Sequence, residues 1–182
     1  NGYKLYNNKR TMLRGGLFFT VNGGMIKNLT IDNFEFTVDS IYVEDSENPG
    51  TYKETKASDD AGLLATYVYG SARFENITVQ NSKLITTRNY GAALLGRVRT
   101  GDAYFREIKV INVEVIAAVA ASKYTGGLIG GIEPNTKLFM DDIYVNGLTI
   151  THQASDMIGA VVGRVRSYLD VNNVVLLNVE IT

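Results

Sequence analysis

A short apolar phrase recurs along this chain of 182 residues. Each copy starts with a small residue and two large apolar residues, and most copies end with another small one. The copies are Gly16-Leu17-Phe18-Phe19, Gly62-Leu63-Leu64-Ala65, Ala93-Leu94-Leu95-Gly96, Gly127-Leu128-Ile129-Gly130 and Ala160-Val161-Val162-Gly163. Counted from residues 17, 63, 94, 128 and 161, successive copies lie 46, 31, 34 and 33 residues apart. Self-similarity at this period indicates a stack of equivalent supersecondary units.

A second phrase follows each copy of the first at a nearly constant distance. It begins with Asn or an acid, alternates aliphatic with other residues, and starts at Asn28, Asn76, Glu107, Asp142 and Asn173. A third apolar stretch follows at 34–36, 82–84, 113–115, 148–150 and 179–181. A spacing of two is typical of strands wetted on one face, and Asn and Gly tolerate the left-handed conformation of turns. The sequence therefore predicts an all-β fold, a parallel β-helix (solenoid) of about five three-stranded coils, right-handed by the general rule for parallel crossovers.

We expect residues 1–182 to form a single β-solenoid domain that is part of a larger protein. The predicted repeats lie near 15–38, 61–85, 91–116, 125–150 and 157–182, and residues 1–14 are expected to form a cap or a partial coil. The long first step leaves 39–60 as an insertion. Strand-forming residues on both sides of Asn48-Pro49-Gly50 predict a protruding hairpin-like loop there.

The predicted stacking makes a prediction about charge, because equivalent residues of neighbouring coils would lie about 4.8 Å apart. The outward columns are Lys27, Glu75, Arg106, Asp141 and Asn172; Glu35, Lys83, Glu114, Thr149 and Glu180; and Arg99, Glu133 and Arg166. No column places like charges next to each other. A further column of small residues, Ala65, Gly96, Gly130 and Gly163, would allow the coil walls to approach closely.

Composition narrows the possible functions. A net charge of -1 gives no electrostatic reason to expect nucleic acid, and no apolar run is long enough for insertion into a membrane. The absence of Cys excludes disulfides and thiolate metal sites, while a single His152 excludes the two-His zinc motif of metalloproteases. We therefore expect no cofactor.

Gly126-Gly127-Leu128-Ile129-Gly130, together with the phrase that begins at Asp142, resembles the GLUG-motif repeat. This repeat occurs in large bacterial surface proteins, including adhesin-like proteins of Bacteroidetes and the non-catalytic β-helical parts of streptococcal IgA-type metalloproteases. The resemblance covers nearly all of residues 15–182; the fourth copy matches fully, and the others replace one or two glycines of the motif. It implies an extracellular or cell-surface module for adhesion or for the display of other domains.

The candidate binding residues form three groups, each with a structural alternative. Arg97, Arg99, Arg164 and Arg166 occur in two Gly-Arg-Val-Arg phrases and suit an acidic polysaccharide, or else a stacking ladder with Glu133. Tyr42, Tyr52, Tyr67 and Tyr69 are candidates because loops on a rigid scaffold commonly carry recognition. Glu44, Asp45 and Glu47 are candidate calcium ligands, or else a solvated acidic loop.

Three functional hypotheses follow. The first is a non-catalytic extracellular module for adhesion or structural display. The second is a β-helix that binds or cleaves polysaccharide, and the third is a fibre or capsid-associated β-helix of a virus or phage. The expected partners are glycans or host and matrix proteins, and adjacent domains of the same polypeptide or another copy at an open C-terminal coil. Asn28 and Asn76 are formal glycosylation sequons, which the repeat pattern itself produces.

Overall fold

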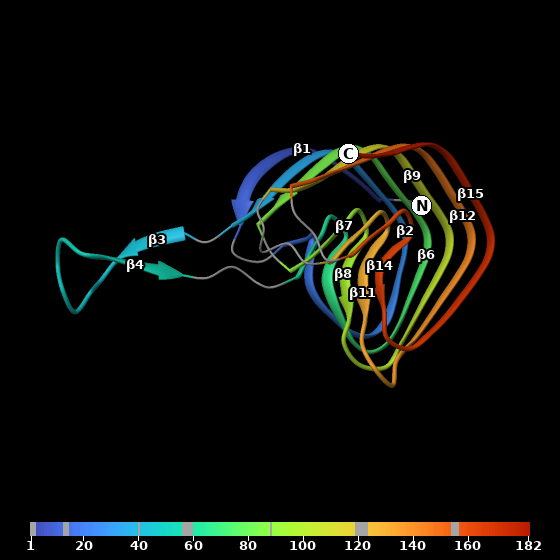
Figure 1. The fold of residues 1–182 in the computed structure, drawn as a ribbon, viewed down its shortest axis with the longest axis horizontal. Helices are drawn as coiled ribbons and strands as arrows, with labels where there is room; N and C mark the ends of the chain where they lie inside the picture. The colour runs from blue at the N-terminus through green and yellow to red at the C-terminus, as the bar shows by residue number, and fades with distance from the viewer. Residues whose placement is uncertain are drawn as a thin grey trace.

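The computed structural model describes residues 3–12, 15–39, 41–55, 60–87, 89–118, 124–153 and 157–182. The regular secondary structure of these ranges is β-strand throughout, and the strands stack as parallel coils, so the predicted β-solenoid is confirmed. In Figure 1, β2, β6, β9, β12 and β15 follow the same curved path one beside the next. The described part of the chain holds no helix of the length and apolarity needed to cross a bilayer.

Parallel pairing divides the solenoid into successive levels that match the predicted repeats. The levels are β2 (Phe18–Val38); β5 (Asp60–Gly62) with β6 (Ala65–Thr86); β7 (Tyr90–Ala92), β8 (Leu95–Val98) and β9 (Asp102–Ala117); β10 (Tyr124–Gly126), β11 (Ile129–Ile132) and β12 (Lys137–His152); and β13 (Met157–Gly159), β14 (Val162–Val165) and β15 (Tyr168–Ile181). Before them, β1 (Tyr3–Met12) pairs in parallel with the second half of β2. This is the position expected for a partial coil.

The predicted second and third strands of each level run into one another, because the chain bends at two corners without leaving the ladder. Asn76 and Asn81 mark these corners in β6, with φ angles of 52° and 48°. The equivalent residues of the other levels also have positive φ, and they are Asn28, Asn33, Glu107, Asn112, Asp142, Gly147, Asn173 and Asn178. The turn role predicted for Asn is therefore confirmed.

The predicted register of the second phrase is confirmed, whereas one copy of the first phrase is displaced by one residue. Leu29, Ile77, Ile108, Ile143 and Val174 pair level by level. In the first phrase, Ala65 pairs with Leu95. Thr66, and not Ala65 as predicted, therefore stands next to Gly96 in the column of small residues. The sequence Gly-Leu-Leu-Ala fits the phrase in either register, and both of its leucines are fully buried.

The core contains the inward side chains of all three phrases and of the residues just before the second phrase. Phe74 and Phe105 are almost completely buried and stack with ring centroids 4.5 Å apart. The last level is less covered: Val171 is 42% exposed and Ile181 is 46% exposed.

The insertion forms the predicted hairpin. β3 (Ile41–Glu44) pairs antiparallel with β4 (Tyr52–Thr55), and these two strands make a sheet of their own. Figure 1 shows this arm projecting away from the solenoid.

Candidate functional site

The first phrase folds the chain back on itself and brings two sheets together. Gly127 and Leu128 join β10 to β11, and Leu128 is fully buried at the bend. A Cβ atom on Gly126 would collide with the Ile129 carbonyl, so only glycine fits there. The outward side chains of the short sheet β13-β10-β7-β5 therefore lie against the outward side chains of β8, β11 and β14.

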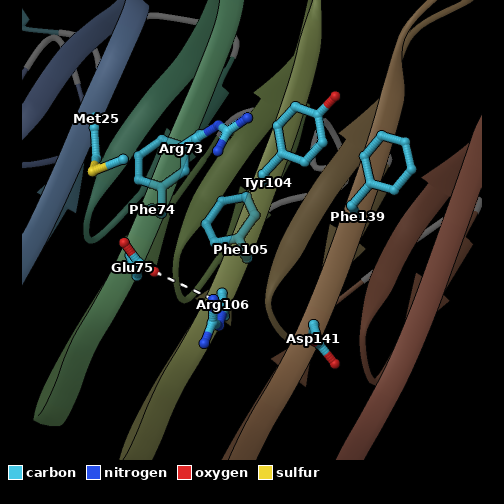
Figure 2. A pocket seen from close by; sticks show the side chains of 9 residues that line it. All are labelled: Met25, Arg73, Phe74, Glu75, Tyr104, Phe105, Arg106, Phe139 and Asp141. Atoms are coloured by element: carbon cyan, nitrogen blue, oxygen red, sulfur yellow. Dashed lines mark ion pairs between the residues drawn. The ribbon is translucent and has the colours of Figure 1, made fainter.

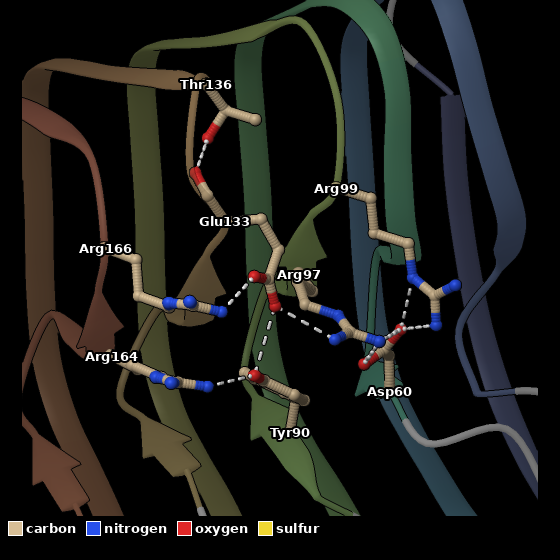
Figure 3. A network of polar contacts seen from close by, with 8 residues as sticks. All are labelled: Asp60, Tyr90, Arg97, Arg99, Glu133, Thr136, Arg164 and Arg166. Atoms are coloured by element: carbon tan, nitrogen blue, oxygen red, sulfur yellow. Dashed lines mark hydrogen bonds and ion pairs between the residues drawn. The ribbon is translucent and has the colours of Figure 1, made fainter.

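A network of polar contacts occupies this fold-back (Figure 3). We call it the arginine network, and its members are Asp60, Tyr90, Arg97, Arg99, Glu133, Arg164 and Arg166. Arg97 bridges the two acids, with Nη2 2.9 Å from an Asp60 oxygen and Nη1 3.0 Å from Glu133 Oε1. Arg99 Nη2 lies 2.6 Å from Asp60 Oδ2. The predicted arginine candidates Arg97 and Arg99 thus meet on one buried carboxylate.

The remaining contacts extend the network to the last level. Arg166 Nη1 lies 3.0 Å from Glu133 Oε2, and Arg164 Nη1 donates to the Tyr90 hydroxyl at 2.9 Å. The Arg164 guanidinium also lies 4.4 Å from the centre of the Tyr124 ring. All four arginines predicted as ligands for an acidic polysaccharide are therefore engaged within the protein.

The predicted ladder of Arg99, Glu133 and Arg166 is half correct. Glu133 pairs with Arg166, but its other partner is Arg97, while Arg99 turns to Asp60. Asp60 stands in the column of Tyr90 and Tyr124, one sheet away from Arg99. Val98, Ile132 and Val165 pair level by level, so the three charged residues that follow them do stack as predicted. Arg99 nevertheless makes its ion pair with Asp60, because the neighbouring sheet supplies this carboxylate.

Burial and charge act on the ionisable groups of the network in opposite directions. The Asp60 side chain is fully buried, and burial raises the pKa of its carboxyl although Arg97 and Arg99 oppose the rise. Burial also opposes the ionisation of Glu133, but hydrogen bonds and charge from Arg97, with Tyr90 and Arg166, hold the pKa of this carboxyl below its usual value. Burial raises the pKa of the Tyr90 hydroxyl against the effect of Arg164. These pairings favour fixed ion pairs at neutral pH.

The candidate tyrosines are in different parts of the molecule. Tyr67 and Tyr69 lie in the wall formed by β6, where the Tyr67 ring lies 4.4 Å from the Arg99 guanidinium and 5.7 Å from the Tyr69 ring. Tyr52 lies on the arm and is 67% exposed. Tyr42 belongs to β3, and its side chain falls outside the described part of the structure.

The acidic candidates of the arm close its turn. Asp45 accepts hydrogen bonds from the Glu47 amide at 3.0 Å and from Asn48 Nδ2 at 2.9 Å, and Lys53 Nζ lies 2.8 Å from its Oδ2 atom. The Asn48, Lys53 and Glu47 contacts lower the pKa of the Asp45 carboxyl. Glu44 accepts a hydrogen bond from the Gly50 amide. These contacts correspond to the structural alternative, in which the acids shape the loop, and no group of three or more His, Cys, Asp or Glu side chains that could hold a metal ion occurs among the described residues. The calcium role of Glu44, Asp45 and Glu47 stays a prediction.

The sequon asparagines belong to a corner ladder. Asn76 Nδ2 donates to Asn28 Oδ1 at 2.9 Å. In the folded protein this bond occupies the Asn76 amide nitrogen to which a glycan would be attached.

A second candidate surface lies on the outer wall, and sequence reasoning missed it. We call it the aromatic stripe, and its members are Met25, Arg73, Tyr104, Phe139 and Tyr168. Figure 2 shows the first four side by side across neighbouring strands. The Tyr104 and Phe139 rings stack with centroids 4.7 Å apart and planes 3° apart. The Arg73 guanidinium lies 5.3 Å from the Tyr104 ring, and the Tyr168 ring lies 5.6 Å from that of Phe139.

Hollows accompany the aromatic stripe along its length. One of about 220 Å³ is lined by Met25, Arg73, Tyr104 and Phe139, with Glu75, Arg106 and Asp141 at one side and the buried Phe74 and Phe105 behind. A shallower one lies over Gly24, Ser71 and Arg73, and another lies between Lys137, Phe139 and Tyr168. Polar and apolar groups converge here as they do in ligand sites.

Comparison with protein-family models, with curated proteins and with solved structures finds no match to this chain. The resemblance to the GLUG repeat thus stays a prediction from the motif residues. The functional argument rests on the geometry of the arginine network and the aromatic stripe.

The sequence did contain a signal for the aromatic stripe. Met25, Arg73, Tyr104 and Phe139 each stand two residues before a member of the predicted column Lys27, Glu75, Arg106 and Asp141. Since side chains two apart on a strand share a face, the outward direction predicted for Lys27, Glu75, Arg106 and Asp141 also applies to this column. An outward column with two aromatic rings and a methionine would have marked the surface.

Proposed function

We propose that this chain is a non-catalytic repeat module for adhesion or structural display on the outside of a cell. The observation that carries the proposal is the arginine network. Asp60 and Glu133, the two acids of the fold-back, are each held by two guanidinium groups at 2.6 to 3.0 Å. Such ion pairs stiffen a wall and do not leave a carboxylate free for proton transfer.

The solenoid itself supports a role in display. The strands of each described level pair only with strands of the neighbouring levels, so an array of such levels is a rigid extended support. The GLUG-like residues 126–130 support an extracellular location. The exposed apolar side chains of the last level, Val171 and Ile181 among them, support contact with an adjacent domain or another copy.

The test is to couple the purified chain to beads and to measure their adherence to immobilised glycans and matrix proteins. The same chain is incubated with polysaccharides, and newly formed reducing or unsaturated ends are assayed. Adherence without new chain ends supports an adhesive module, and neither adherence nor cleavage supports structural display alone. Polysaccharide cleavage that survives repurification would overturn the proposal.

One observation favours cleavage as a second candidate function. Glu75 and Asp141 line the same hollow from strands two levels apart, which places their backbones about 10 Å from each other. Two carboxylates that line one hollow are the residue pair that glycosidases use as acid and base. Arg106 lies between them and 3.7 Å from Glu75. In this case Glu75→Gln and Asp141→Asn would each abolish the release of reducing ends, whereas Glu114→Gln on a neighbouring column would not.

A further inference from the structure

The length of the aromatic stripe is set by the stacking of the solenoid. Its residues come from β2, β6, β9, β12 and β15 in succession. Since neighbouring strands lie about 4.8 Å apart, the stripe extends for about 19 Å along the stack. One sugar ring of an extended polysaccharide has a length similar to this spacing between neighbouring strands. A linear glycan lying along the stack would therefore meet equivalent positions at Met25, Arg73, Tyr104 and Phe139. In the last level Asp170 stands in this column, and Tyr168 stands two residues before it.

The aromatic residues provide apolar surfaces that remain accessible. Met25 is 49% exposed and Tyr168 is 51% exposed, while Tyr104 and Phe139 are partly buried. Aromatic rings offer flat apolar area at small conformational cost, and Tyr adds a hydroxyl. The C–H faces of pyranose rings are complementary to such surfaces. The hollow of about 220 Å³ beside these rings gives a sugar a place to enter.

The polar groups around the stripe suit hydroxyl groups better than anions. In the bordering columns the cations Lys27, Arg106 and Lys137 alternate with the acids Glu75, Asp141 and Asp102, and the column of the stripe itself adds Arg73 and Asp170, so the charges balance. The two tyrosine hydroxyls already donate to acids. The Tyr104 hydroxyl lies 3.5 Å from Asp102 Oδ2, and the Tyr168 hydroxyl lies 3.3 Å from Asp170 Oδ2. Carboxylates accept hydrogen bonds from sugar hydroxyls and repel sulfate or uronate groups.

We propose that the aromatic stripe binds a linear neutral polysaccharide lying along the solenoid stack. Tyr104 and Phe139, which stack on each other along the wall, contact its sugar rings through the parts that remain exposed, and the bordering carboxylates and Arg73 hydrogen-bond its hydroxyl groups. This inference rests on the proposed adhesive function and names its ligand class and site. It also separates binding from the arginine network, where the charged groups already hold one another.

The test is calorimetric titration of the whole chain with neutral hexasaccharides, namely cellohexaose, laminarihexaose and mannohexaose, and with a heparin hexasaccharide as the anionic comparison. We expect at least one neutral hexasaccharide to bind and the heparin fragment to bind more weakly or not at all. Tyr104→Ala and Phe139→Ala should each weaken binding about tenfold, as expected for the loss of one aromatic contact. Tyr144→Ala, on another part of the wall where Tyr144 pairs with Lys109, is the matched control and should leave binding unchanged.

A second measurement needs no variant. Neutral hexasaccharide added to the wild-type chain should shift the ring NMR signals of Tyr104 and Phe139 and leave those of Tyr52 in place. Binding that persists in both alanine variants, or that shifts other rings instead, would overturn the site. If the beads adhere to a surface but no neutral hexasaccharide binds, the ligand class is wrong while the adhesive function stands; if neutral hexasaccharides bind but the beads adhere nowhere, the adhesive function fails alone.

Discussion

The ring of Tyr90 lies directly over the backbone of Gly131, so that a Cβ atom on Gly131 would be 2.5 Å from Tyr90 Cε1 and 2.8 Å from Cδ1. Tyr90 is 4% exposed, and its hydroxyl contacts Glu133 at 3.2 Å and Arg164 at 2.9 Å. The glycine thus makes room for the ring that joins the two sheets of the fold-back. Because Tyr90 is held at both ends, it has little freedom to move aside.

Gly131→Ala should therefore lower the free energy of unfolding by about 1 to 3 kcal/mol, the usual cost of an inserted methyl group in a packed site. Chemical denaturation monitored by circular dichroism measures it. The matched control is the same substitution in a Tyr90→Leu background, where the ring is gone and the added cost should be clearly smaller. Equal costs in both backgrounds would place the strain elsewhere.

Glu133 is the acid shared by Arg97 and Arg166, and it is 18% exposed. Glu133→Lys would put an ammonium group between two guanidiniums and should lower the free energy of unfolding by about 1 to 3 kcal/mol. Glu133→Gln keeps acceptor and donor atoms of similar shape and should lower it less. Denaturation midpoints for the two variants provide the measurement, and a lysine variant as stable as the glutamine variant would contradict the ion-pair arrangement.

The same residue predicts a pH dependence. The pKa of the Glu133 carboxyl lies below its ordinary value of 4.5 in the folded protein. Its stabilising contribution is therefore complete above pH 4.5 and is lost as the pH falls through the folded-state pKa. The difference in free energy of unfolding between wild type and Glu133→Gln should shrink as the pH is lowered from about 6 to about 3. A difference that stays constant over this range would show that Glu133 is not held ionised by its arginines.

The contribution of Asp60 to stability should change with pH in the opposite direction, because burial raises the pKa of its carboxyl above the ordinary 3.8. Its folded-state carboxyl binds a proton more readily than the unfolded one, so the contribution of this ionisation to stability is present below pH 3.8 and is lost as the pH rises through the folded-state pKa. The comparison of wild type with Asp60→Asn over the same pH range isolates this effect. A difference that changes with pH in the same direction as for Glu133 would contradict the burial argument.

The fold could be predicted from the sequence because each level repeats two independent signals. Apolar residues at a spacing of two set the inward face, and the Asn positions set the corners, so that Leu29, Ile77 and Ile108 were aligned correctly across levels. The second copy of the first phrase was displaced because Leu63 and Leu64 both suit a buried position. No signal within four residues distinguishes the two registers.

The candidate site was less predictable, because its contacts join residues from different columns. The sequence indicates which residues stack along one column, such as Glu75 and Arg106. It does not indicate that the fold-back brings Asp60 from one sheet against Arg97 and Arg99 of another. The one-residue displacement in the second copy also placed Asp59, not Asp60, in the column of Tyr90. A contact across the bend therefore required the coordinates.

The arm provides the last prediction. β3 and β4 pair only with each other, and the ion pairs of Asp45 are made to Lys53 of the same hairpin. Replacing residues 41–55 with a short Gly-Ser linker should therefore leave the melting temperature of the solenoid unchanged to within about 2 °C, since loop length itself contributes little to stability. Asp45→Ala, the matched point variant, should increase proteolytic cleavage within the arm without changing that melting temperature. A loss of several degrees on removal of the arm would mean that the hairpin packs on the solenoid and is part of its folding unit.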